Sequence, residues 1–208
     1  MSERLMEYSC SEFADALAAK ASVPGGGGAA AYVGALSVAL CSMVGNFTLG
    51  KRKYAEHEDD VRRMLAEGET IRKRLLELVD EDAAAFEPLS RAYGIPKEDP
   101  SRAETLERCT KDALQGPLQM MREICRAIEL LEEMNAKGSR LLISDVGCGA
   151  ALAAAALQAA AMNVFVNTKG LGDRAYAQGI DAECDSMLAD YVPRAQAVAQ
   201  QVMSGMRV

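Results

Sequence analysis

The chain contains no tryptophan, a single histidine and few aromatic residues, which make up 5% of its 208 residues. A core with so few large rings must be built from alanine, leucine, valine, isoleucine and methionine, and this set is rich in good helix formers. Nothing in the sequence alternates between apolar and polar residues with a period of two over a useful length. The sequence therefore predicts an all-α fold with almost no strand.

Basic residues are outnumbered by acidic ones, 23 to 30, which gives a net charge of −7. This balance argues against general nucleic-acid binding, which needs a basic surface. The one histidine, His57, lies in an acidic run, and the six cysteines form no C-x-x-C pair. A zinc site and a Ser-His-Asp nucleophile therefore have little support. Scattered cysteines are typical of reduced thiols, so we expect a cytoplasmic protein. We also expect that the protein needs no metal and no separate cofactor.

A secretory leader is not expected, because residues 1–8 are polar. The segment from Ala29 to Leu49 has no charged residue and is long enough to span a bilayer. It is rich in small residues rather than in leucine, isoleucine and phenylalanine, which favours a central helix of a soluble bundle. We expect no membrane partner.

Capping and breaking residues predict where the helices lie. The expected first helix begins at Ser9, which forms a capping box with Glu12, and runs to about Ala21. The others are expected at 29–49, 55–93, 101–137 with a break at Gly116-Pro117, 144–169, and 173–205 with an interruption near Pro193. No repeat or linker divides the chain. We therefore expect one domain over residues 1–208, with the uncharged 29–49 and alanine-rich 144–169 helices at its centre.

Four glycines follow a proline directly before the uncharged helix, in the order Ser22, Val23, Pro24, Gly25, Gly26, Gly27, Gly28. Glycine loses the most backbone entropy on folding, so four in succession indicate that the bare backbone is used. The amides at the start of a helix are suited to holding an anion. This segment is therefore a candidate binding loop.

One carboxylate interrupts an apolar stripe. In the helix expected from 71 to 93, Val79 and Phe86 belong to a face with helical spacing, and Asp82 lies between them on that face. Burying a charge without a partner raises the pKa of a carboxyl group, and such groups are candidates for acid or base chemistry. The alternative is a structural aspartate that caps a helix or pairs inside the bundle.

Three further polar residues lie in the alanine-rich helix. Asp145 stands at its expected start, where an acidic residue is also a common cap. Asn163 and Asn167, one turn apart, share a face near its other end. Their amides suit either a heterocycle or a neighbouring helix.

Lys51, Arg52 and Lys53 place three positive charges directly after the uncharged helix. Such a run is usually a solvated face, although Lys51 follows a segment that must be buried. The preceding residues nearly form a nucleotide-binding P-loop, but Arg52 replaces the Ser or Thr that holds magnesium and no strand precedes the loop. We discount a nucleotide triphosphatase for this reason.

These motifs, in this order, resemble the cyclodeaminase/cyclohydrolase family of folate enzymes. The likeness rests on the Pro-Gly-rich segment 24–30, the basic segment 50–54, the stretch 80–86 around Asp82, Ser144-Asp145-Val146-Gly147, and Asn163 with Asn167. Four glycines stand where three followed by Ser or Ala are expected. The family includes the C-terminal domain of formiminotransferase-cyclodeaminase and stand-alone methenyltetrahydrofolate cyclohydrolases.

The resemblance implies an all-helical homodimer that binds a tetrahydrofolate substrate, with or without a polyglutamate tail. It implies Asp82 as proton shuttle, Asp145 as a second carboxylate near the cation, and Lys51 as a further catalytic group. Substrate contacts would come from Ser22, Pro24, Gly25, Gly26, Gly27, Arg52, Lys53, Asn163 and Asn167. Asp145 and Asn163 cannot both touch one reacting carbon, because eighteen residues of one helix span about 27 Å.

Four functions stay open at this stage. The length of the chain favours cyclohydrolase, which converts 5,10-methenyltetrahydrofolate and water to 10-formyltetrahydrofolate. Cyclodeaminase, which closes 5-formiminotetrahydrofolate with release of ammonia, is the first alternative. A folate-binding bundle without catalysis is a second, and a membrane-associated helical protein is a third.

Overall fold

The computed structural model describes residues 4–207, and this part of the chain is helical without strands. Short 3-10 helices lie at Leu5–Glu7 (η1), Arg52–His57 (η2) and Arg140–Leu142 (η3). The α-helices are α1 (Cys10–Ala18), α2 (Gly26–Thr48), α3 (Glu58–Tyr93), α4 (Arg102–Ala113), α5 (Gln115–Lys137), α6 (Ile143–Thr168) and α7 (Arg174–Gly205). The predicted all-α bundle is confirmed.

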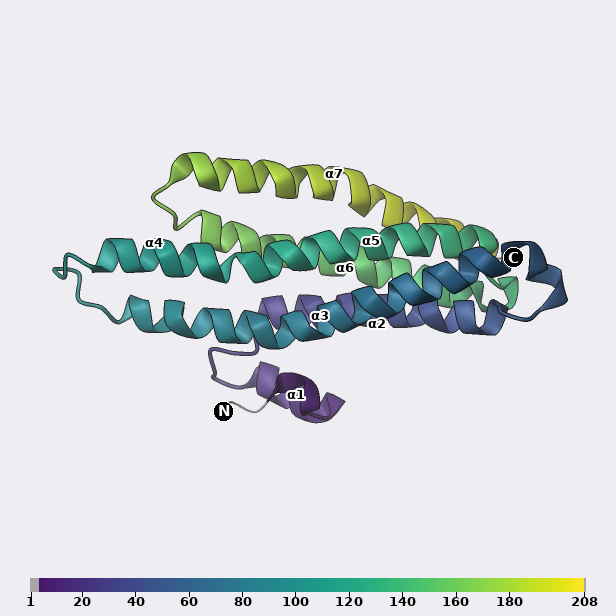
Figure 1. The fold of residues 1–208 in the computed structure, drawn as a ribbon, viewed down its shortest axis with the longest axis horizontal. Helices are drawn as coiled ribbons and strands as arrows, with labels where there is room; N and C mark the ends of the chain where they lie inside the picture. Colours follow the sequence, from purple (N-terminus) through teal and green to yellow (C-terminus); the bar gives the residue numbers. More distant parts are fainter. Residues whose placement is uncertain (1–3, 208) are drawn as a thin grey trace.

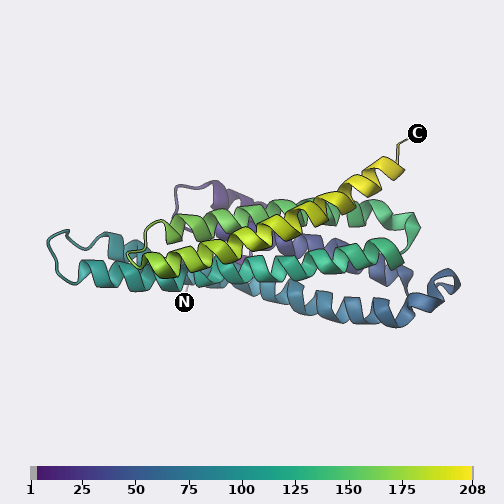
Figure 2. The same ribbon diagram turned by 90° about the horizontal axis from the view of Figure 1, so that it is seen from above.

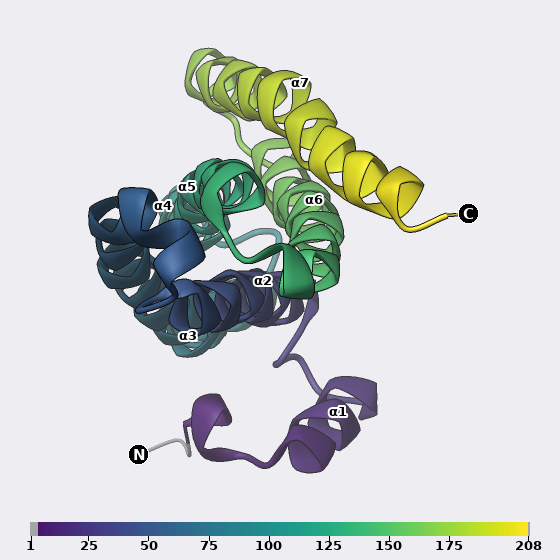
Figure 3. The same cartoon turned by 90° about the vertical axis from the view of Figure 1, so that its right-hand side faces the viewer.

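The long helices lie side by side along one axis (Figure 1). α4 continues into α5, and together they run antiparallel to α3. Seen from above, α7 crosses α6 and α5 diagonally (Figure 2). The end-on view shows α7 outside α6 and the short α1 at the edge of the bundle (Figure 3), where Phe13 of α1 packs against Tyr32 of α2.

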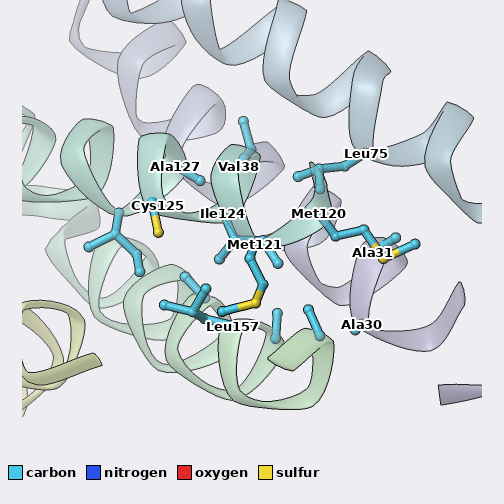
Figure 4. Close-up of a cluster of buried hydrophobic side chains, with 14 of the residues drawn as sticks. Ala30, Ala31, Val38, Leu75, Met120, Met121, Ile124, Cys125, Ala127 and Leu157 are labelled. Carbon is cyan, nitrogen blue, oxygen red and sulfur yellow. The ribbon is translucent and has the colours of Figure 1, made fainter. Parts of the chain in front are cut away.

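Small residues let α2 and α6 pack closely at the centre of the bundle. A Cβ atom on Gly149 of α6 would lie 3.0 Å from the Ser37 carbonyl oxygen of α2, so the two backbones approach to a distance that only glycine permits. Around this pair lie Met120, Met121 and Ile124 of α5, with Leu157 of α6 and Ala30 and Ala31 of α2 (Figure 4). The prediction of two central helices rich in small residues is confirmed.

The first helix begins as predicted. Both halves of the Ser9–Glu12 capping box are present, and α1 ends at Ala18 rather than at Ala21. The start predicted for α2 was wrong, because three of the four glycines, Gly26 to Gly28, form its first turn and Gly25 is its N-cap. Glycine is a poor helix former. The close approach of other side chains to this turn, described below, is what requires glycine here.

Two other boundaries differ from expectation. The break between α4 and α5 falls at Leu114, two residues before Gly116. α7 runs through Pro193 without interruption. A proline removes one backbone hydrogen bond of a helix, but buried residues on both sides of Pro193, Cys184 and Ala195 among them, hold the two halves of α7 against the bundle.

α2 and the helical stretch 140–168 are each long and apolar enough to cross a membrane by length and composition. Both also contribute buried residues to the core that α3 and α5 complete. The buried side, 56% of the apolar window in α2 and 50% in the other stretch, packs in the core of the bundle.

Candidate functional site

Asp82 lies on α3 and is half-buried against the first turn of α2. Its carboxylate accepts a hydrogen bond from the Gly28 amide. Burial raises the pKa of Asp82 to about 6, and the hydrogen bond from Gly28 opposes that rise without cancelling it. The group therefore changes protonation close to neutral pH, as a proton shuttle requires.

Gly27 lies so close to this carboxylate that no larger residue fits there. A Cβ atom on Gly27 would lie 2.5 Å from Oδ2 of Asp82, and one on Gly116 would lie 3.7 Å from Oδ1. A Cβ on Gly25, in contrast, would meet nothing within 4 Å. The glycine run thus serves a close approach of Asp82 to the α2 backbone. Gly116, which the sequence marked as a helix break, also lies beside Asp82, but at an ordinary contact distance that a larger residue could keep.

Asn163 of α6 lies at the same end of α2. Its Nδ2 would be 3.2 Å from a Cβ on Gly26, and it donates to the Ala159 carbonyl. Asn167 donates in the same way to the Asn163 carbonyl. Each of these bonds uses one proton of the side-chain amide. No described residue donates to the carboxamide oxygen of Asn163 or Asn167, so both oxygens are open to a ligand.

A cavity of about 600 Å³ opens on the other side of this segment of α3. Its wall includes Val23, which precedes Pro24, and Ala83, which follows Asp82, while Arg4 and Asp80 stand at its rim. A smaller cavity of about 160 Å³, lined partly by Ser22, continues along α3. Neither cavity is lined by Asp82 or by the glycine run, although the larger one has a size that small ligands occupy.

Lys51 lies at the opposite end of α2, in a network of its own. Its Nζ donates to Oγ of Ser139 over 3.3 Å, and the backbone amide of Ser139, a buried residue, donates to Oγ1 of Thr48 over 2.9 Å. The hydroxyl of Tyr54 accepts the Arg140 amide over 2.9 Å, and this bond lowers the pKa of Tyr54. Nothing in the sequence had marked Ser139.

Asp145 belongs to this second end. It is half-buried in the first turn of α6, where the helix dipole favours a negative charge, and it forms no ion pair with any residue of the described range 4–207. Arg52 and Lys53 are exposed, and Nζ of Lys53 lies 5.6 Å from the centre of the Tyr54 ring.

The predicted site residues thus fall into two groups. The first, the Asp82 end, holds Asp82, Ser22, Pro24, Gly25 to Gly27, Asn163 and Asn167. The second, the Lys51 end, holds Lys51, Arg52, Lys53 and Asp145. The 23 residues of α2 separate them, a length of about 33 Å. One chain does not bring the two groups together.

Within residues 4–207, no three His, Cys, Asp or Glu side chains are grouped so that they could hold a metal ion. The prediction that the protein needs no metal or separate cofactor is not tested by this observation.

Residues 9–186 match the family described as formiminotransferase-cyclodeaminase. The chain is 42% identical over 182 residues to a methenyltetrahydrofolate cyclohydrolase of Methylorubrum extorquens, a match that covers 86% of this chain and 88% of that protein. It is 29% identical to the formimidoyltransferase-cyclodeaminase of Mus musculus, but covers only 36% of that longer protein.

A crystal structure of formiminotetrahydrofolate cyclodeaminase from Thermotoga maritima has the same fold. The TM-score is 0.84 with 28% sequence identity, and the superposition covers 96% of this chain and 99% of that one. The likeness therefore includes the helices at both ends of the bundle.

Proposed function

Because the chain belongs to the formiminotransferase-cyclodeaminase family, we propose that it is a methenyltetrahydrofolate cyclohydrolase, which converts 5,10-methenyltetrahydrofolate and water to 10-formyltetrahydrofolate. The observation that carries the proposal is Asp82, a carboxylate whose pKa burial raises to about 6 at a glycine-lined helix end. The 42% identity to the Methylorubrum extorquens cyclohydrolase, at nearly equal length, supports this choice of reaction.

In the proposed mechanism, ionised Asp82 takes a proton from water as the water oxygen bonds to the methenyl carbon. The cation becomes a neutral tetrahedral adduct. Protonated Asp82 then gives its proton to N5 as the bond between carbon and N5 breaks, and the adduct hydroxyl releases its proton to solvent. One proton is released per turnover, as the overall charge balance requires.

Asp145 and Lys51 lie at the other end of α2, about 33 Å from Asp82, so one chain does not bring them to the carbon on which Asp82 acts. Arg52 and Lys53 suit the carboxylates of a glutamate tail, including a polyglutamate tail. The Ser22–Gly27 segment with Asn163 and Asn167 would bind the ring system. We further propose a cytoplasmic homodimer without nucleic-acid or membrane partners.

Cyclodeaminase activity is the alternative, and the Thermotoga maritima likeness favours it. In that reaction N10 attacks the formimino carbon and ammonia leaves, so a proton shuttle would serve there too.

Both substrates should be tested with one purified preparation. Loss of methenyltetrahydrofolate absorbance above the uncatalysed rate is the expected result, and its appearance from 5-formiminotetrahydrofolate would assign the alternative. Saturable folate binding without either reaction would indicate a non-catalytic bundle. Absence of both binding and turnover would contradict every folate assignment.

A further inference from the structure

A carboxylate of α4 holds the turn between α6 and α7. Residues 169–173 form this α6–α7 turn, which lies beside α4 (Figure 1). The half-buried carboxylate of Glu107 accepts the Gly172 amide over 2.7 Å and the Asp173 amide over 3.2 Å. Hydrogen bonds to an ionised acceptor are stronger than those between neutral groups. Glu107 therefore binds two successive backbone amides of a turn that is distant in the sequence.

Two further side chains on the same helical face contact the start of α7. Nζ of Lys111 lies 2.9 Å from Oδ2 of Asp173 and 3.4 Å from Oε1 of Glu107. It also lies 4.8 Å from the centre of the Tyr176 ring, and Nε2 of Gln115 donates to the Tyr176 hydroxyl over 3.1 Å. Glu107, Lys111 and Gln115 follow one another at intervals of four residues, which is the spacing of one helical face. We call these three side chains the 107–115 clamp.

The other polar contacts of the turn stay within α6 and α7. Nη1 of Arg174 donates to the carbonyls of Thr168 and Leu171 over 3.2 and 3.3 Å. Oγ1 of Thr168 donates to Oδ1 of Asp181 over 2.6 Å. These bonds fold the turn onto the two helices that it joins. The 107–115 clamp supplies the hydrogen bonds and ion pairs that fasten the turn to α4 and α5.

The α6–α7 turn is bonded in its backbone to the last turn of α6, which carries Asn167. The Gly170 amide donates to the Asn167 carbonyl over 3.0 Å, and the Leu171 amide donates to the Thr168 carbonyl over 3.2 Å. Asn167 in its turn donates to the Asn163 carbonyl. The ends of helices fray where few contacts hold them. A displaced α6–α7 turn would therefore loosen the last turn of α6 and the carboxamide of Asn167.

The other end of the clamp adjoins Asp82. Gly116 follows Gln115, and a Cβ atom on Gly116 would lie 3.7 Å from Oδ1 of Asp82. A Cβ atom on Gly26 would lie 3.2 Å from Nδ2 of Asn163. Asp82 and Asn163 thus reach the first turn of α2 from different helices, α3 and α6. The clamp ties the segment beside Asp82 to the end of α6.

We infer that Glu107, supported by Lys111, is a positioning residue of the folate site: it holds the α6–α7 turn against α4 and thereby fixes the carboxamide of Asn167 for the substrate. This inference rests on the proposed function, in which Asn163 and Asn167 bind the ring system. It adds a residue that acts through Asn167 rather than on the substrate. Loss of the clamp weakens substrate binding and leaves the chemistry of Asp82 intact.

Glu107→Gln tests this role, because glutamine offers one acceptor oxygen where the carboxylate offers two, and carries no charge. With 5,10-methenyltetrahydrofolate as substrate, we expect KM to rise about threefold to tenfold while kcat stays within about twofold of wild type. A loss of folded protein would instead lower the apparent kcat and leave KM unchanged. Asp112→Asn is the matched control, since it makes the same charge change on α4 in an exposed pair with Arg108, and its KM should equal that of wild type.

A double-mutant cycle shows whether Glu107 acts through Asn167. The Kd of tetrahydrofolate, which lacks the reacting carbon, is measured by titration calorimetry for Glu107→Gln, Asn167→Ala and the double variant. If Glu107 acts through Asn167, the double variant binds as weakly as Asn167→Ala and no more weakly. Losses that multiply in the double variant, or a wild-type Kd for Asn167→Ala, would overturn the inference.

Lys111→Met is the second variant, and it removes the cation that Glu107 and Asp173 share. Its KM should rise in the same direction, so the role is tested even if Glu107→Gln fails to fold. A wild-type KM in every folded clamp variant, together with normal turnover, would overturn the inference and leave the proposed function standing. A wild-type protein that neither binds nor converts a folate would contradict the proposed function, and this inference with it.

Discussion

At the scale of single residues, two features of its surroundings shift the pKa of Asp82 in opposite directions. The α2 terminus and the Gly28 amide favour the ionised form, yet burial dominates and raises the pKa of Asp82 to about 6. Glu81, its neighbour, is exposed and accepts two hydrogen bonds from Arg74, which lower its pKa. Adjacent carboxylates of one helix therefore have opposite effects on the stability of the fold.

Replacing Asp82 should stabilise the protein above neutral pH. The unfolded pKa is near 3.8 and the folded pKa about 6, so ionisation at pH 8 costs the folded state about 3 kcal/mol, and this cost vanishes below pH 4. We expect Asp82→Asn to have a higher urea midpoint than wild type at pH 8 and an equal one at pH 4. Glu81→Gln, the control, should lower the midpoint at pH 8. A midpoint for Asp82→Asn below wild type at pH 8 would show that the charge stabilises the fold.

The glycine run should be sensitive at one position and tolerant at another. A Cβ on Gly27 would lie 2.5 Å from the Asp82 carboxylate, which must move, whereas a Cβ on Gly25 meets nothing. Gly27→Ala is expected to reduce kcat/KM at least tenfold, and Gly25→Ala to reduce it less than threefold. Steady-state kinetics, with far-ultraviolet circular dichroism as the check on folding, would measure both. Equal effects at the two positions would contradict the geometry.

At the scale of helices, the end of α2 is held to the connection between α5 and α6 by a buried hydroxyl. Oγ1 of Thr48 donates to the Val44 carbonyl over 2.7 Å and accepts the amide of Ser139. The bond fixes Ser139, whose own hydroxyl accepts from Lys51. The position of Lys51 thus depends on a contact between segments that are far apart in the sequence.

Thr48→Val should destabilise this junction by about 1–3 kcal/mol, because a buried amide loses its acceptor while the side-chain shape is kept. The free energy of unfolding from urea titration measures the loss. Thr70→Val is the matched control, since the exposed Thr70 hydroxyl donates only to the Ala66 carbonyl of its own helix. A loss at Thr48 no larger than at Thr70 would contradict the assigned role of the bond.

The sequence could predict which segments are helical, since apolar spacing and caps such as Ser9–Glu12 are local signals. The start of α2 and the continuity of α7 could not, because tertiary contacts override the propensities of Gly26 and Pro193. Asp82 was found because it breaks an apolar stripe. Ser139 was missed, since its importance comes from hydrogen bonds across the bundle.

At the scale of the whole molecule, two central helices place chemical groups at both ends of a long bundle. α2 has no charged residue and α6 only Asp145, so neighbouring segments supply the other charged site residues: α3 supplies Asp82 at one end, and the connection after α2 supplies Lys51 at the other. The family to which the chain belongs includes relatives in which this helical unit covers about a third of a longer protein.

The central claim is that Asp82 moves the proton in hydrolysis of methenyltetrahydrofolate. The most direct test is kcat/KM for loss of methenyltetrahydrofolate absorbance between pH 5 and 8, for wild type and Asp82→Asn, after subtraction of the uncatalysed rate. We predict that wild-type kcat/KM rises with pH through about 6, where Asp82 ionises, and that Asp82→Asn loses at least ~100-fold at pH 7. An Asp82→Asn variant within twofold of wild type, with the same pH profile, would contradict the claim.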